Sequence, residues 1–251
     1  MRAFIAVLLA ASVLAGKALA VDPPSCAVPD NLLFVDNNLK RVANAVGKQH
    51  QLAISVFGTG SSTLAGADGP SLAYPARLEA ALNQRLSNVM VRVTTRTKNG
   101  LTADGMRRNM KDLLVDEKPN LVIWQTGTVD AIRRAELDEF RAALEDGVET
   151  LRAAGSDVML MNMQYSPRTE SMIAVGPYAD EMRAVAQQRD IPLFDRFAIM
   201  RYWSDEGAFD FYAAGKDNGL ARRVHDCLGR AIGALVIEDG HLRPFVNKAT
   251  Q

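Results

Sequence analysis

Hydrophobic residues follow two alternating patterns along the chain. Short apolar or alternating runs predict strands, and longer stretches with apolar residues every three or four positions predict helices. The predicted strands cover residues 52–57, 89–93, 121–124, 158–163 and 191–194. Helical spacing extends over residues 32–46, 74–86, 102–115, 136–154, 177–189 and 221–238. This alternation favours right-handed βαβ units, and hence an α/β protein with a central parallel sheet of about five strands covered by helices on both faces.

The carboxyl edge of such a sheet is where ligands bind. The loops that leave the predicted strands at this edge are therefore the candidates for chemistry. They begin near Gly58, Thr95, Gln125, Gln164 and Asp195.

The first twenty residues have the pattern of a secretory signal peptide. Arg2 precedes a short apolar run, and residues 18–20 (Ala-Leu-Ala) match the small-x-small site of signal peptidase. The run is too short for a membrane anchor, and the alternative is a buried N-terminal helix. We therefore expect an exported protein, periplasmic or secreted, that is not stably inserted in a membrane. Its expected parts are a signal peptide (1–20), a proline-rich lead-in (21–30), one domain (31–240) and a tail (241–251).

Composition and charge narrow the function further. The chain of 251 residues is 48% hydrophobic and 23% charged, with 29 basic and 29 acidic residues. Removal of Arg2 and Lys17 with the signal peptide leaves a net charge of −2. These values argue against a disordered chain and against a nucleic-acid-binding protein. Two cysteines and three histidines leave little material for a metal site, so we expect no metal and no cofactor.

Export would allow the two cysteines to form a disulfide. In an oxidising compartment Cys26 and Cys227 either pair as one disulfide or remain two free thiols. A bridge closing a loop of about 200 residues would stabilise the fold by about 4–5 kcal/mol in the chain-entropy model.

The loop over residues 57–66 (FGTGSSTLAG) is the most informative segment. A dinucleotide-binding fingerprint needs glycine where Thr63 stands, and a P-loop needs a lysine that is absent. A nucleophile turn needs a serine at the end of a strand, with backbone N–H groups nearby to stabilise an oxyanion. The sequence contradicts the dinucleotide fingerprint and the P-loop but not the nucleophile turn. The alternative to a nucleophile turn is a loop that only reverses the chain direction.

Three of these loops together resemble the characteristic blocks of the SGNH (GDSL-type) hydrolases. The matching segments are TGSST at 59–63, NG at 99–100 and GTVDA at 127–131, and YPARL at 74–78 is similar to a YPxxL element of bacterial members. The resemblance extends over residues 52–237 and implies a three-layer α/β/α sandwich of flavodoxin-like SGNH type. It also implies Ser61 as the nucleophile, with Ser62 as the adjacent alternative. The backbone N–H groups of Ser61 and Gly100 are then the oxyanion donors.

The chain departs from the family pattern at two positions. Val129 stands where the pattern has an asparagine that donates to the oxyanion, and Asp130 beside it is expected to be structural. His225 is the only histidine near the position of the base, but Arg222 stands where its acid should be. Asp210 and Asp217 are other candidates for that acid.

The final helix allows a second alignment with the family. In that alignment Gly219 occupies the position of the histidine, and the site has lost its base. His225 is then a packing or capping residue beside the two cysteines.

The resemblance implies an exported serine esterase that forms an acyl-enzyme on Ser61, with His225 as the base. Its expected substrate is a small-molecule or polysaccharide ester, such as an O-acyl or O-acetyl group. The alternative is a catalytically impaired protein of the same fold that binds envelope carbohydrate or another ligand. The sequence does not indicate an oligomeric state.

Overall fold

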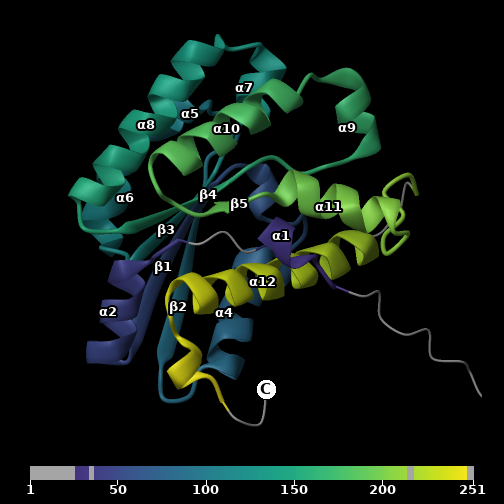
Figure 1. The fold of residues 1–251 in the computed structure, drawn as a ribbon. Helices are drawn as coiled ribbons and strands as arrows, with labels where there is room; N and C mark the ends of the chain where they lie inside the picture. Colours follow the sequence, from purple (N-terminus) through teal and green to yellow (C-terminus); the bar gives the residue numbers. More distant parts are fainter. Residues whose placement is uncertain (1–25, 34–36, 214–217, 248–251) are drawn as a thin grey trace, which may run out of the picture.

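A computed structural model describes residues 26–33, 37–213 and 218–247 of the chain (Figure 1). The expected signal peptide lies outside these residues. The described residues form a five-stranded parallel sheet in the order β2-β1-β3-β4-β5. Its strands are β1 (Gln51–Gly58), β2 (Met90–Thr97), β3 (Leu121–Gln125), β4 (Asp157–Met161) and β5 (Leu193–Phe194). The predicted α/β fold with its parallel sheet is confirmed.

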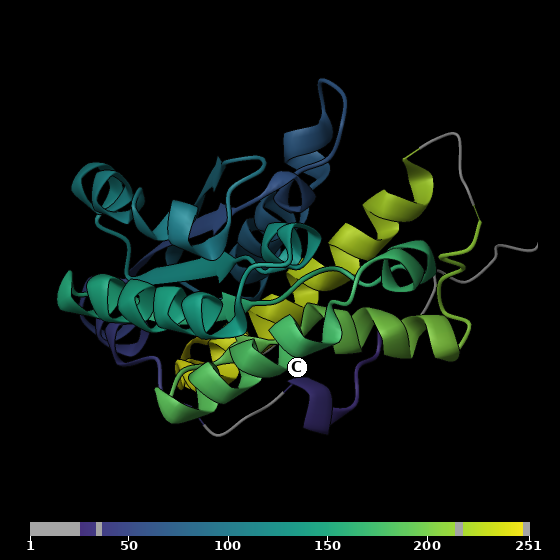
Figure 2. The same cartoon turned by 90° about the horizontal axis from the view of Figure 1, so that it is seen from above.

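Helices cover both faces of the sheet (Figures 1 and 2). One face carries α2 (Lys40–Gln49), α4 (Tyr74–Arg85) and α12 (Gly219–Asp239). The other carries α5 (Ala103–Arg107), α6 (Met110–Glu117), α8 (Leu137–Ala153) and α10 (Gly176–Gln188). The chain runs from β1 outward to β2 and then crosses back to β3, so β1 and β3 flank the point where the winding direction reverses. In open α/β sheets this reversal leaves a crevice beyond the strand ends.

Two glycines let helices approach their neighbours closely. A Cβ at Gly147 of α8 would lie 2.4 Å from Cζ3 of Trp124, the fully buried indole of β3. A Cβ at Gly229 of α12 would lie 2.5 Å from Cβ of Arg77 on α4. Side chains at these positions would force both layers apart, because contacts this short do not occur between packed carbon atoms.

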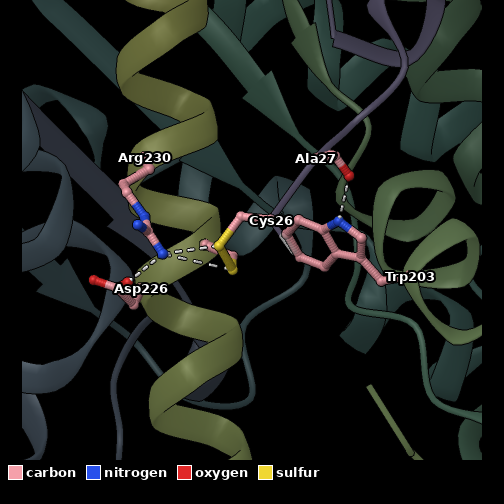
Figure 3. Close-up of a disulfide and its surroundings, with 6 residues drawn as sticks. Cys26, Ala27, Trp203, Asp226 and Arg230 are labelled. Carbon is pink, nitrogen blue, oxygen red and sulfur yellow. Dashed lines mark hydrogen bonds and ion pairs between the residues drawn. A yellow bond between two sulfur atoms is a disulfide. The ribbon is translucent and has the colours of Figure 1, made fainter. Parts of the chain in front are cut away.

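A disulfide joins Cys26 to Cys227, with a Cα–Cα distance of 5.2 Å (Figure 3). The predicted pairing is therefore confirmed. The bridge holds the N-terminal segment against α12, and Nε1 of Trp203 fixes the same segment by donating to the carbonyl oxygen of Ala27 at 3.0 Å. Nη2 of Arg230 lies 2.8 Å from Sγ of Cys26.

Several elements differ from the sequence-based prediction. The stretch 102–115 forms two helices, α5 and α6, because Asn109 ends the first by bonding back to the carbonyl of Gly105. Helical spacing over 32–46 corresponds to α1 (Asp30–Leu33) and α2, and residues 34–36 lie outside the described part. Helices that the pattern did not predict are α3 (Gly69–Leu72), α7 (Thr128–Arg133), α9 (Pro167–Met172) and α11 (Arg196–Asp205), with the short 3-10 turns η1 (Gly60–Ser62) and η2 (Arg243–Phe245).

Across residues 26–33, 37–213 and 218–247, no helix combines the length and apolar character needed to cross a membrane.

Candidate active site

The serine turn follows β1 at the carboxyl edge of the sheet and is held from β3. Oε1 of Gln125, the last residue of β3, accepts hydrogen bonds from the backbone N–H and the hydroxyl of Thr59, both at 2.9 Å. Gly58 is required here because a Cβ would lie 2.2 Å from Oγ of Ser62. The end of β3 therefore fixes where the turn places its two serines.

The two serines have different environments. Ser62 is fully buried, and its hydroxyl lies 2.9 Å from the hydroxyl of Tyr74 and donates to Oε1 of Gln125 at 3.1 Å. Ser61 is half-buried, and its hydroxyl accepts a hydrogen bond from Nη1 of Arg196 at 3.2 Å. A nucleophile must reach a substrate, so the arrangement favours Ser61 over the alternative, Ser62.

Two backbone N–H groups stand free near this edge. Within the part of the chain that the structure describes, neither Ser61 N–H nor Gly100 N–H donates a hydrogen bond. Gly100 has a φ of 72°, a left-handed conformation that glycine adopts readily. Free N–H groups at such an edge are suited to stabilise an oxyanion.

Asp130 holds the loop that contains Gly100. Its buried carboxylate accepts the backbone N–H of Ala103, the first residue of α5, at 2.9 Å. Burial raises the pKa of Asp130, and the backbone N–H donors oppose that rise. Asp130 is thus structural, as expected from the sequence.

Val129 has no side-chain donor, but an amide from another loop lies close to the serine turn. A Cβ at Gly60 would lie 3.0 Å from Oδ1 of Asn99, which places the Asn99 side chain beside the turn. Asn99 precedes Gly100 in the NG segment and was not singled out in the sequence. Its position two residues beyond β2 is the signal that could have identified it.

His225 lies inside α12, not in the loop before it. Its imidazole is buried, and Nδ1 accepts the backbone N–H of Tyr74 at 3.0 Å. Burial, together with the positive charge of Arg196, lowers the pKa of His225 to about 3. No hydrogen bond joins Ser61 to His225 among the described residues. Because Tyr74 is the first residue of α4, this hydrogen bond matches the capping role considered for His225. The role of His225 as the base stays a prediction.

The acids considered for orienting His225 lie elsewhere or outside the described residues. The Asp210 carboxylate accepts the backbone N–H groups of Tyr212 and Ala213 at 2.9 and 3.1 Å. Asp217 is not among the described residues. Arg222 is exposed on α12, and Gly219 is the first residue of that helix.

Arg196 is the side chain that contacts Ser61. It is the first residue of α11, separated from β5 by Asp195 alone, and only 1% of it is exposed. Nη1 donates to both the carbonyl oxygen and Oγ of Ser61 at 3.2 Å, and Nη2 donates to Oε1 of Gln164 at 3.3 Å. Its Cζ lies 5.7 Å from the ring centroid of Tyr74, within cation–π range.

The loop at Asp195 was predicted from the sequence as a candidate for chemistry, but Arg196 was not. The available signal was the Asp195–Arg196 step after a strand, followed by apolar residues at helical spacing (Phe197, Met200). The Asp195 carboxylate accepts the N–H of Ala198 at 2.9 Å and so caps α11.

The described residues contain no group of three histidine, cysteine or acidic side chains placed to hold a metal ion.

A parallel sheet in this order, with a serine turn after its first strand, matches the flavodoxin-like fold of the SGNH hydrolases. The chain belongs to the non-GDSL lipase-like family, whose profile matches residues 25–241. The sequence resemblance to SGNH hydrolases is thereby confirmed. No curated protein matches the chain.

Solved structures with this fold include several esterases. TesA is 22% identical with a TM-score of 0.58, over 73% of this chain and 97% of TesA. An acetylxylan esterase from Geobacillus stearothermophilus, Axe2, is 16% identical with a TM-score of 0.59, over 74% and 94% of the two chains. The esterase EstA from Pseudoalteromonas sp., solved with monoethylphosphonate as inhibitor, is 15% identical with a TM-score of 0.57, over 74% and 97%. At these identities the similarity shows the shared fold.

Proposed function

We propose that this protein is a serine esterase that hydrolyses carboxylic esters through an acyl-enzyme on Ser61. One observation carries the proposal. Ser61 is the half-buried serine of a turn at the reversal point of the sheet, and its own N–H and that of Gly100 have no partner among the described residues. A nucleophile and two free donors are the minimum for acyl transfer. Family membership and the esterase neighbours support the same reaction class.

In this mechanism Ser61 Oγ attacks the carbonyl carbon of the ester. The backbone N–H groups of Ser61 and Gly100 stabilise the oxyanion, and each removed donor of this kind typically costs about 3–4 kcal/mol of transition-state stabilisation. Asp130 supports Gly100 indirectly by fixing the start of α5.

The substrate class we propose is an O-acyl ester, with O-acetylated polysaccharide as the first candidate. The acetylxylan esterase among the structural neighbours supports this choice. We also propose that the protein is exported, because residues 1–20 have a signal-peptide pattern and the Cys26–Cys227 bridge suits an oxidising compartment.

A fluorophosphonate probe tests the acyl-enzyme directly. The mature protein is treated with the probe, and any adduct is located by mass spectrometry. We expect one adduct on Ser61, together with hydrolysis of p-nitrophenyl acetate and of acetylated xylo-oligosaccharides. Ser61→Ala should abolish both. Ser71→Ala, which removes an exposed serine of α3, is the matched control and should keep both.

The second candidate is a binding protein that retains the fold without hydrolysis. The hydrogen bond between His225 and Tyr74 favours it, because that bond occupies the only histidine near the site. A folded protein that gives no adduct on Ser61 and hydrolyses neither ester would establish this alternative.

A further inference from the structure

Resting on the proposed esterase function, we propose that Arg196 is a catalytic residue that stabilises the negative charge on Ser61 Oγ when the serine becomes the nucleophile. In this role a guanidinium stands beside the serine where serine esterases have an imidazole. The reaction then takes its proton acceptor from solvent hydroxide.

The contact between the two side chains is direct. Nη1 of Arg196 lies 3.2 Å from Oγ of Ser61 and at the same distance from the Ser61 carbonyl oxygen. A guanidinium has only donors and stays protonated, so it cannot accept the serine proton. It can donate to Oγ, and a donated hydrogen bond strengthens when the acceptor becomes anionic.

Within the part of the chain that the structure describes, the charge of Arg196 has no counter-charge. No described carboxylate pairs with this side chain, and its Nε–H has no partner among the described residues. A buried charge without an anionic partner is costly. Anionic Oγ, formed during the reaction, supplies the missing negative charge at hydrogen-bond distance.

The groups that face Arg196 do not neutralise it. Tyr74 on α4 lies under the guanidinium, and burial raises the pKa of Tyr74 to about 12, so the phenol stays neutral. His225 on α12 is neutral as well, with its pKa lowered to about 3 by burial and by the charge of Arg196. Burial lowers the pKa of Arg196 itself to about 10, which leaves it charged at neutral pH.

The surrounding structure holds Arg196 rigidly. Asn162, the residue directly after β4, accepts the N–H of Phe197 at 2.9 Å and donates to Asp195 at 2.7 Å. Asp195 also pairs with Arg183 at 2.7 Å. Because these contacts fix the first turn of α11, the guanidinium is positioned before the substrate binds, as electrostatic catalysis requires.

The proposed reaction balances with water and hydroxide alone. Hydroxide takes the proton of Ser61 Oγ and becomes water, and the Oγ lone pair then forms a bond to the carbonyl carbon while the C=O π electrons move to oxygen. Collapse of this intermediate breaks the bond to the alcohol oxygen, which takes a proton from water. A second hydroxide attacks the acyl carbon, the bond to Oγ breaks, and the released Ser61 oxyanion is protonated by water.

A thiol at position 61 measures the effect of Arg196 without any esterase activity. The chain has two cysteines, both in the disulfide, so Ser61→Cys introduces the single free thiol. Its thiolate is titrated by absorbance at 240 nm. We expect a thiol pKa at least one unit below the ordinary value of about 8.5. In Ser61→Cys combined with Arg196→Gln, we expect the pKa to rise by at least one unit.

Two variants complete the experiment. Arg201→Gln removes an exposed positive charge from the same helix and should leave the thiol pKa within a few tenths of a unit. Arg196→Lys keeps the charge and should keep most of the shift. A thiol pKa of 8.5 or higher with Arg196 present would overturn the proposal, and this measurement does not require the Arg196→Gln protein to fold.

The experiments distinguish failure of the proposed esterase function from failure of the proposed role of Arg196. A lowered thiol pKa, combined with no fluorophosphonate adduct on wild-type Ser61, would contradict the esterase proposal and support the Arg196–Ser61 interaction. An active esterase with an unshifted thiol would remove Arg196 from the mechanism and keep the esterase.

Discussion

Nδ1 of His225 accepts the backbone N–H of Tyr74 at 3.0 Å, and this bond joins α12 to the start of α4. An imidazole that accepts at Nδ1 carries its proton on Nε2 when it is neutral. It then offers a donor and not a basic nitrogen to its other neighbours. The bond therefore favours the capping role of His225 over the role of a base.

We predict that His225→Asn keeps most of the esterase activity. The asparagine Oδ1 can replace Nδ1 as the acceptor for Tyr74 N–H, so α4 stays capped. We expect the rate of p-nitrophenyl acetate hydrolysis to fall less than about tenfold, whereas loss of a general base typically costs about 10²–10⁴-fold. His225→Leu is the contrasting variant, because it leaves the Tyr74 N–H unpaired and should destabilise the fold by about 1–3 kcal/mol. A drop of 10³-fold in a well-folded His225→Asn protein would restore His225 as the base.

The same histidine makes the fold sensitive to acid. Its pKa is about 3 in the folded protein and about 6.5 in the unfolded chain, so between these values the unfolded chain binds more protons. The stabilisation is complete above pH 6.5 and is lost as the pH falls, by up to about 1.4 kcal/mol per unit. Urea unfolding at pH 7.5 and pH 5 should show a loss from this group of about 2 kcal/mol, and His225→Asn should abolish it. Equal losses in both proteins would contradict the assignment.

We expect the disulfide to contribute strongly to stability. Cys26 and Cys227 are 201 positions apart, so reduction releases most of the chain in the unfolded state. The chain-entropy model gives an upper value of about 5 kcal/mol for a loop of this length. Thermal unfolding with and without dithiothreitol measures the effect. The double variant Cys26→Ser/Cys227→Ser should melt near the reduced wild type and should not respond to the reductant.

The central strands β1, β3 and β4 were predictable because they are largely buried on both faces. All five residues of β3 are buried, and the run LVIWQ reads as a central strand without further context. Helix α11 was missed because β5 has only two residues and only Asp195 separates the strand from the helix, a break too short to mark a new element in the hydrophobic pattern. The division of 102–115 into α5 and α6 depends on a hydrogen bond from the Asn109 side chain to the Gly105 carbonyl. The spacing of hydrophobic residues does not predict this bond.

The candidate site could be predicted only where a loop resembles a family motif. Ser61 and Gly100 were selected because their loops resemble the SGNH blocks, and their roles stay predictions. Arg196 and Asn99 are brought to the serine by the sheet order, from strands far apart in the sequence. His225 was selected because it is the only histidine near the position of the base. Its hydrogen bond to the Tyr74 N–H could not be predicted from the sequence.

Position 129, where the family pattern has asparagine and this chain has valine, allows a gain-of-function test. Val129 is the second residue of α7, half-buried, and stands where the family pattern has a donor to the oxyanion. If ester hydrolysis uses an oxyanion site between the Ser61 and Gly100 N–H groups, Val129→Asn adds a third donor, and such donors are worth about 10²–10³-fold in kcat. Because this loop has evolved around valine, we expect a smaller gain, of at least about tenfold in the kcat for p-nitrophenyl acetate. Val129→Leu changes the side chain without adding a donor and should give no gain. An unchanged kcat in a folded Val129→Asn protein would mean that the oxyanion lies out of reach of α7.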